Sequence, residues 1–330
     1  MKHKLDETNN HSSFLTPHSS LLLGYYGFGN LGDELLLKAC IKILNEHGIG
    51  NEKIIVLSNN PEETQKNFNV KSMNRWKFLE VVKAMRQSEN FILGGGGLFQ
   101  DSTSVKSCVY YWGIVRLAKL FGLKIYALGQ SVGSFSSKIS EILTGDALRL
   151  CELVQVRDKN SFDIAKDFNV KNLEPASDLV MTLKPLEFSN SNRDLILVNL
   201  RPHKELEKFV KIIAPHVKNS DYKKIGAALS VEDEKILIEN QKILGLDEIK
   251  LIKNFDEAEK LFSRASCAVG MRLHFGVLAR IFKVKTALIP YDIKVSEFAS
   301  QSDIPVIIDK WQNPSMPSEI PDYYCDKISL

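Results

Sequence analysis

The chain has 330 residues, about the length of two domains, and 44% of them are hydrophobic, which is enough for a substantial core. The 43 Lys and Arg residues against 40 Asp and Glu residues give a net charge of +3. This composition excludes a disordered tail or a disulfide-rich miniprotein and gives no electrostatic reason to expect a nucleic-acid partner. The five cysteines are widely spaced and form no CxxC pair, so we expect reduced thiols and no zinc site.

The first 19 residues are polar, and we expect a disordered extension there. Asp6 and Glu7 occur where a signal peptide needs a basic end followed by an apolar stretch. Apolar runs in the sequence are all shorter than the ~20 residues of a membrane span. These features favour a cytoplasmic protein.

Short apolar runs alternate with amphipathic stretches from about residue 21 to residue 308, which is typical of βαβ units with parallel sheets. We therefore predict an α/β protein. In the first half, the expected strands cover residues 20–24, 53–58, 90–93, 124–128 and 153–156, and the longest helix covers residues 105–121. In the second half, the expected strands cover residues 194–200, 224–229, 249–252, 267–269 and 286–289, and helices include residues 206–216 and 256–265.

A polar stretch without periodicity, residues 184–193, is the predicted linker between these two halves. It divides the chain into an N-terminal domain over residues 20–185 and a C-terminal domain over residues 186–310, with a cleft between them. An irregular tail of residues 311–330, which contains three prolines, is expected to pack across the surface.

A glycine-rich turn follows the first expected strand and contains a formal GxGxxG pattern, in the sequence GYYGFGNLGDE at residues 24–34. Such a turn favours anions at the N-terminus of the next helix. Nicotinamide binding is disfavoured, because the second strand is not followed by an acidic residue for the ribose and Asp33 lies where a pyrophosphate would bind. The alternative is a tight turn in which Asn30 or Asp33 caps the helix.

Four consecutive glycines at residues 94–97 directly follow the strand expected at residues 90–93. Their lack of side chains suits a backbone that approaches a ligand or another segment closely. Asp101 and Ser102 follow, with a carboxylate and a hydroxyl that suit sugar hydroxyls, although helix capping is an equal alternative for them.

Cationic residues follow several of the predicted strands. Arg272 and His274 come after the strand at residues 267–269, and Arg157, Arg201 and Lys294 follow other strands. Strand carboxyl ends share one edge of a parallel sheet, so these groups would converge on a small multivalent anion, with histidine adding proton transfer near neutral pH. Taken one at a time, each arginine or lysine is equally explained as a solvated surface charge, and the histidine as a hydrogen-bonded residue without a catalytic role.

The combination of motifs resembles the polysaccharide pyruvyl transferase family, closest to its CsaB-type members, over roughly residues 20–305. The motifs are those at residues 24–34 and 94–104, GQSVG at 129–133, VRD at 156–158, GMRLH at 270–274 and YDIKVSEF at 291–298. The resemblance implies a GT-B-like fold of two Rossmann-like domains facing across a cleft. It also implies transfer of a pyruvyl group from phosphoenolpyruvate, as a ketal, to a sugar of a lipid-linked cell-wall precursor of the kind that anchors surface layers.

By this resemblance, His274 is the expected catalytic residue, and Arg157, Arg272 and Lys294 are expected to bind phosphoenolpyruvate. Arg201 is added to the donor-binding residues because it ends a predicted strand at the same edge. We expect no other cofactor and no metal. The expected acceptor-side or loop positions are Tyr25, Gly29, Asn30, Asp33, Gly95, Gly96, Gly97, Asp101, Ser102, Gln130, Tyr291 and Asp292. The N-terminal domain is the expected acceptor side, and contact with the inner membrane face is part of the hypothesis. The oligomeric state is left open.

Three other functions remain open from the sequence. A glycosyltransferase with a nucleotide-sugar donor would share the two-domain shape but release a nucleoside diphosphate. A carbohydrate- or phosphate-binding protein without catalysis would bind saturably and form no product. An oxidoreductase is the least favoured, for the reasons given for nicotinamide.

Overall fold

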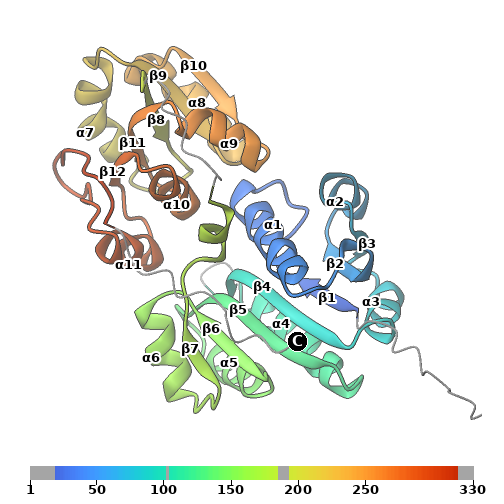
Figure 1. Ribbon diagram of the computed structural model, residues 1–330. Coiled ribbons are helices and arrows are strands. Elements are labelled where there is room, and N and C mark those ends of the chain that lie inside the picture. Colours follow the sequence, from blue (N-terminus) through green and yellow to red (C-terminus); the bar gives the residue numbers. More distant parts are fainter. Residues whose placement is uncertain (1–18, 102–103, 185–192, 319–330) are drawn as a thin grey trace, which may run out of the picture.

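The computed structural model describes residues 19–101, 104–184 and 193–318, and all statements on elements and contacts refer to these residues. The predicted extension, except residue 19, most of the predicted linker, the site position Ser102 and the end of the tail lie outside the described residues. The remainder forms two α/β units, each with its own parallel sheet (Figure 1).

The first sheet of the described chain has seven parallel strands in the order β3-β2-β1-β4-β5-β6-β7. Its strands are β1 Ser20–Leu23, β2 Ile54–Ser58, β3 Lys71–Asn74, β4 Asn90–Phe99, β5 Lys124–Val132, β6 Leu153–Val156 and β7 Leu173–Pro175. Its helices are α1 Leu31–Glu46, α2 Pro61–Phe68, α3 Phe78–Arg86, α4 Val105–Leu120, α5 Lys138–Arg149 and α6 Lys159–Asp167, with short 3-10 turns η1 Asn51–Lys53 and η2 Leu179–Leu183. The strand order reverses between β1 and β4, where α/β proteins bind ligands.

The second sheet has five parallel strands among the described residues, in the order β10-β9-β8-β11-β12. Its strands are β8 Leu195–Asn199, β9 Lys223–Ala228, β10 Glu248–Leu251, β11 Ala265–Gly270 and β12 Lys285–Leu288. Its helices are α7 Leu206–Lys218, α8 Val231–Leu244, α9 Phe255–Phe262, α10 Leu273–Ile281 and α11 Ile293–Gln301. Here the order reverses between β8 and β11. The predicted fold class, α/β with two Rossmann-like domains, is confirmed.

One apolar core joins the two domains. It contains Leu22 of β1 and Leu36 of α1 together with Leu197 of β8 and Phe275 of α10, all of them fully buried. Helices α1 and α10 lie next to each other between the sheets, and η2 packs against both (Figure 1). Two further cores lie on the outer faces, under α3–α5 in the first domain and under α7 and α8 in the second.

The glycine run at residues 94–97 was predicted as a loop, and this was wrong, because the four glycines belong to β4. They continue to pair with β5, from Gly94 opposite Leu128 to Gly96 opposite Gln130, with an irregular register beyond. A Cβ on Gly95 would lie 2.8 Å from the side chain of Leu36 in α1, so the absent side chain serves close packing at this point.

Two strands were missed because their sequences are short and polar. β3 has the sequence KSMN, and β7 is three residues long and ends in Pro175. Both lie at the edges of the first sheet. Edge strands need not bury an apolar run, so the signal that identifies central strands is absent from them.

Candidate active site

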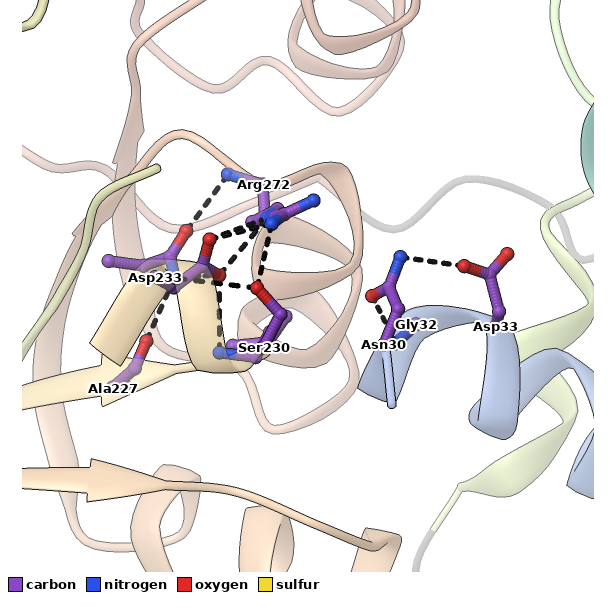
Figure 2. A network of polar contacts seen from close by, with 9 residues as sticks. Asn30, Gly32, Asp33, Ala227, Ser230, Asp233 and Arg272 are labelled. Atoms are coloured by element: carbon purple, nitrogen blue, oxygen red, sulfur yellow. Dashed lines mark hydrogen bonds and ion pairs between the residues drawn. The ribbon is translucent and has the colours of Figure 1, made fainter. Parts of the chain in front are cut away.

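The carboxyl ends of β8 and β11 fix Arg272, the N-cap residue of α10. Its backbone N–H donates to the Asn199 side chain at 3.0 Å. Its guanidinium donates to the Asp233 carboxylate through Nη2 at 2.6 Å and through Nε at 3.0 and 3.1 Å, and Nη2 also donates to Ser230 Oγ at 3.0 Å. Asp233 is fully buried. Arg272 is therefore held rigidly, with part of its charge balanced (Figure 2).

The N-terminus of α1 faces this network (Figure 2). Asn30 caps the helix by accepting from the N–H of Gly32 at 3.2 Å, and its amide donates to Asp33 Oδ2 at 2.6 Å. The N–H of Leu31 donates to the carbonyl oxygen of Leu229 at 2.9 Å, which joins α1 to the end of β9. The glycine-rich turn of the first domain thus docks on the second domain.

His274 lies in the first turn of α10 and contacts the first domain. Its Nε2 is 3.6 Å from Asp178 Oδ2, and the same oxygen accepts from Arg157 Nη1 at 2.6 Å. The side chains of Arg157 and Asp178 are each 5% exposed. Arg157 also donates through Nε to Ser131 Oγ at 2.8 Å. A buried chain of arginine, aspartate and histidine therefore crosses between the domains.

Lys294 brings a third cation to this junction from the start of α11. Its Nζ is 3.2 Å from Asp292 Oδ2, and Asp292 caps α11. A Cβ on Gly97 would lie 3.8 Å from the same Nζ, so the ammonium group lies beside β4 of the first domain. Arg157, Arg272 and Lys294 all act electrostatically on both Asp33 and His274. The structure thus brings together these five residues from both domains.

Burial changes the proton affinity of two of these groups. Loss of water raises the pKa of Asp33 to about 7, although Lys294, Arg157 and Arg272 oppose the shift. Loss of water lowers the pKa of His274 to about 4; the Asp178 carboxylate opposes this shift, while the three cations add to it. At neutral pH the imidazole is therefore uncharged, and Asp33 is divided between its protonated and ionised forms.

A cavity of about 560 Å³ opens beside this cluster, between the two domains. Arg157, Asp158 and Asp178 line it from the first domain, and Lys294 and Phe298 line it from the second. A second cavity, of about 1180 Å³, lies along α1 between Gly27 and Gly29 on one side and Phe255 on the other. Arg157 and Lys294 of the cluster line the first cavity, and both cavities are lined by a mixture of apolar and charged side chains.

Arg201 and Tyr291 form a separate contact near the end of β8. The guanidinium carbon of Arg201 is 4.2 Å from the centroid of the Tyr291 ring, and Nε of Arg201 is buried without a hydrogen-bond partner among the described residues. Tyr291 acts electrostatically on Arg272, which places this pair next to the cluster. No direct contact links Arg201 with Arg157 or Lys294 in the described part of the chain.

Other predicted positions serve the fold. The carboxylate of Asp101 accepts from the N–H groups of Ser136 and Ser137 at 2.7 and 2.8 Å, and the residue is 5% exposed. These contacts hold the turn before α5 and favour the alternative structural role, and a contact with sugar hydroxyls stays a prediction. The buried Gln130 amide donates to the carbonyl oxygens of Leu93 and Leu128. Gly95 packs against Leu36 as described above, and Gly96 lies near Asp33. Tyr25 and Gly29 are exposed.

Sequence reasoning missed Asp178 and Asp233. Asp178 follows β7, one of the strands that were not predicted, so its position at a strand end could not be recognised. Asp233 lies in the first turn of α8, where an acidic residue is ordinary because of the helix dipole. Neither residue carries a sequence signal for its role as the partner of an arginine.

Residues 19–101, 104–184 and 193–318 hold neither a metal-binding cluster nor a membrane-spanning helix. No group of three or more His, Cys, Asp or Glu side chains there is arranged to hold a metal ion. No helix there combines the length and apolar character needed to cross a bilayer.

Solved structures confirm the fold type. The chain is similar to the UDP-GlcNAc 2-epimerase from Methanocaldococcus jannaschii, with a TM-score of 0.59 and 13% identity over 88% of this chain and 89% of that one. It is also similar to Alr3699/HepE from Anabaena in complex with UDP and glucose, with a TM-score of 0.56 and 12% identity over 82% and 81%. At this identity the likeness shows the fold alone, a GT-B-like arrangement of two Rossmann-like domains.

The family follows from the sequence itself. The sequence model of the polysaccharide pyruvyl transferase family matches residues 30–293, which include the helix α1 N-terminus and four of the five residues of the cluster, with Lys294 one position beyond the matched range. The chain belongs to this family. No curated protein sequence matches it.

Proposed function

We propose that the protein transfers the pyruvyl group of phosphoenolpyruvate to a pair of sugar hydroxyls as a cyclic ketal and releases phosphate. The observation that carries the proposal is the convergence of Arg157, Arg272 and Lys294 on His274 and Asp33 beside the 560 Å³ cavity. Phosphoenolpyruvate has a carboxylate and a phosphate, about three negative charges near neutrality, and guanidinium groups suit both.

The reaction needs a proton at C3 of the donor and the removal of two hydroxyl protons. Protonation of C3 turns the methylene into a methyl group and leaves C2 electrophilic. The first sugar oxygen attacks C2, the C2–O bond to phosphate breaks, and the second sugar oxygen closes the ring. One of the two hydroxyl protons restores the group that protonated C3, and the other leaves on the phosphate.

Asp33 and His274 suit these two kinds of proton transfer. With a pKa of about 7, Asp33 is partly protonated at neutral pH, so we assign it as the donor to C3. With a pKa of about 4, His274 is uncharged in the free protein, so we assign it as the acceptor of a hydroxyl proton. The expected role of His274 in proton transfer is kept and is now specified as that of a base. The cations hold the carboxylate and stabilise the departing phosphate.

The acceptor we propose is a sugar of a lipid-linked cell-wall precursor, met at the inner face of the membrane. Support comes from the resemblance to CsaB-type members and from the 1180 Å³ cavity, which joins the α1 N-terminus to a partly apolar lining that includes Leu35, Phe68 and Phe255 together with Lys38 and Lys42. Lys38 and Lys42 pair with Asp256 and Glu46 in the same lining, so the apolar walls, which suit a lipid chain, are the part of this cavity that supports a lipid-linked acceptor.

The test is incubation with phosphoenolpyruvate and a panel of lipid-linked and lipid-free disaccharides, with phosphate measured and the products analysed by mass spectrometry. The expected result is acceptor-dependent phosphate release and a product whose added mass is that of a pyruvyl ketal. A nucleotide-sugar donor is run in parallel. Release of a nucleoside diphosphate, without phosphate from phosphoenolpyruvate, would instead identify a glycosyltransferase.

A further inference from the structure

Exposed aromatic side chains gather at the carboxyl ends of β1 and β3. Tyr25 is 45% exposed and stacks on Phe28, with ring centroids 3.9 Å apart and planes within 8°. Trp76 is 57% exposed and lies 5.1 Å from the ring of Tyr110. We call Tyr25, Phe28 and Trp76 the aromatic platform. Such a group of accessible rings needs an explanation, because large aromatic side chains normally contribute to burial.

The buried side chain of Arg75 packs against the inner side of these rings and fixes their positions. Arg75 is 3% exposed, and its guanidinium carbon is 5.5 Å from the centroid of Phe28 and 5.1 Å from that of Trp76. The same guanidinium donates to the carbonyl oxygen of Gly24 and to the hydroxyl of Tyr111. Because Arg75 contacts both sides of the platform and is itself held, the rings are positioned before any ligand arrives.

The side-chain amide of Asn59 fixes the indole ring of Trp76 at the exposed edge of the aromatic platform. Trp76 Nε1 donates to Asn59 Oδ1 at 2.9 Å, and Asn59 Nδ2 donates to the carbonyl oxygen of Gly27 at 3.3 Å. A carboxamide has two N–H groups and two acceptor lone pairs, so Asn59 retains one donor and one acceptor. The site therefore offers flat apolar faces next to a free donor and a free acceptor.

We propose that the aromatic platform binds a pyranose ring of the glycan acceptor, with Asn59 as its hydrogen-bonding partner. A pyranose has apolar C–H faces and a rim of hydroxyls, which match ring faces beside an amide. The proposal rests on the proposed function for the identity of the ligand as the acceptor. The position fits, because Asp33 acts electrostatically on Tyr25 and Gly27 and Gly29 line the 1180 Å³ cavity.

A membrane surface is the alternative occupant, because Phe78 and Leu79 next to the platform are 66% and 81% exposed. The polar details favour the sugar. Insertion of Trp76 into lipid would carry the Asn59 amide and its unpaired donor and acceptor out of water, which is costly. A sugar hydroxyl can satisfy them.

The first experiment measures binding with no donor present. Saturation transfer from the full-length protein to the methyl glycosides of glucose, galactose, mannose, N-acetylglucosamine and N-acetylmannosamine is recorded by NMR for the wild type and for Trp76→Ala, Trp76→Phe and Phe78→Ala. We expect transfer to at least one glycoside, loss in Trp76→Ala, retention in Trp76→Phe and no change in Phe78→Ala. Circular dichroism confirms that the variants are folded.

Three outcomes of this experiment overturn the proposal. The first is that the wild type transfers saturation to no glycoside. The second is that Trp76→Ala transfers as much as the wild type, and the third is that Phe78→Ala loses as much transfer as Trp76→Ala. Co-sedimentation with phosphatidylglycerol vesicles is measured in parallel, and loss of vesicle binding in Trp76→Ala without loss of glycoside transfer would assign the surface to the membrane.

A kinetic experiment separates this proposal from the proposed function. With an acceptor that supports phosphate release, Trp76→Ala should raise the acceptor KM about tenfold, the size expected for one lost aromatic contact, and leave the KM for phosphoenolpyruvate unchanged. An unchanged acceptor KM would overturn the platform and leave the transferase activity established. Glycoside binding that depends on Trp76, without phosphate release from any acceptor, would support the platform and reject the transferase activity.

Discussion

The imidazole of His274, in the C-terminal domain, lies directly against the backbone of Gly32 in the N-terminal domain. A Cβ on Gly32 would lie 2.1 Å from Nδ1 of the imidazole. Gly32 is the second residue of α1, directly before Asp33, so a single turn of helix positions both groups to which we assign proton transfer. The glycine-rich turn thus provides space for a histidine.

Gly32→Ala should therefore displace the His274 ring. We expect turnover in the phosphate-release assay to fall by about 10²-fold, the size expected for a displacement of roughly 1 Å at a reacting group. Alanine is otherwise the better helix residue, so the helix itself should tolerate the change.

Gly113→Ala is the matched control, because Gly113 lies in α4 and its Cβ would meet no atom within 4 Å. This variant should keep full turnover and gain about 0.5–1 kcal/mol of stability. Equal turnover in both variants would show that the contact between Gly32 and His274 has no catalytic importance.

His274→Ala tests the proposed base. Removal of a positioned acid or base typically costs 10²–10⁴-fold in rate, so we expect phosphate release to fall within about that range. The KM for phosphoenolpyruvate should change little, because an imidazole with a pKa of about 4 carries no charge that holds the donor at neutral pH. Turnover near that of the wild type, in a folded variant, would remove the role.

Asp178→Asn tests the buried ion pair. Asp178 and Arg157 are both 5% exposed, and burial alone would raise the pKa of Asp178, but Arg157, His274 and the N–H of Val180 outweigh this and lower it. Loss of the negative charge leaves the Arg157 guanidinium buried and unbalanced. We expect urea denaturation to show a loss of about 3–5 kcal/mol in the free energy of unfolding.

Asp309→Asn serves as the control for Asp178→Asn. Asp309 pairs with Lys208 at 2.7 Å, but its side chain is 80% exposed. An exposed pair contributes about 0–1 kcal/mol. Similar losses in the two variants would contradict the importance we give to burial.

Asp33→Asn tests the pH dependence of donor binding. As pH rises through about 7, Asp33 ionises among the three cations, partly neutralises them and repels a trianion. The affinity of the wild type for phosphoenolpyruvate should therefore fall above pH 7 relative to that of Asp33→Asn. Calorimetric titration from pH 5.5 to 8.5 measures this, and the difference between the two proteins removes the contribution of the donor's own ionisation.

Ionisation of the Asp33 carboxyl group should also lower the free energy of unfolding as pH rises. Because the pKa of Asp33 is raised in the folded state, from 3.8 to about 7, its favourable contribution is complete below pH 3.8 and is lost as pH rises through about 7. Asp33→Asn should consequently be more stable than the wild type at pH 8 by a larger margin than at pH 5. A margin independent of pH would mean that Asp33 ionises normally in the folded protein.

Central strands and the cationic residues could be predicted from the sequence. The apolar runs of β1, β2 and β8 are buried in the structure, and the rule that strand carboxyl ends share an edge placed Arg157 and Arg272 beside their strands. The edge strands β3 and β7 could not be predicted, because they bury few side chains. The role of Gly95 depends on Leu36 of α1, a packing partner that is remote in sequence.

The aspartates that pair with Arg157 and Arg272 could not be predicted from the sequence, for a different reason. Asp178 and Asp233 acquire their roles only when their own domain is folded, since each binds an arginine from another element of the same domain. The pKa shifts of Asp33 and His274 likewise arise from burial at the domain boundary, and no spacing along the chain encodes them.

The hydrogen bond between Leu31 and Leu229 has a consequence for how the substrate acts on the molecule. It adds to the apolar core shared by the two domains, and Arg157 and Lys294 line the neighbouring cavity from opposite domains. Each of these cations is paired with a carboxylate of its own domain, Arg157 with Asp178 and Lys294 with Asp292. The two domains are therefore already joined without an anion between them, and the donor would enter a pocket that the folded protein has formed in advance.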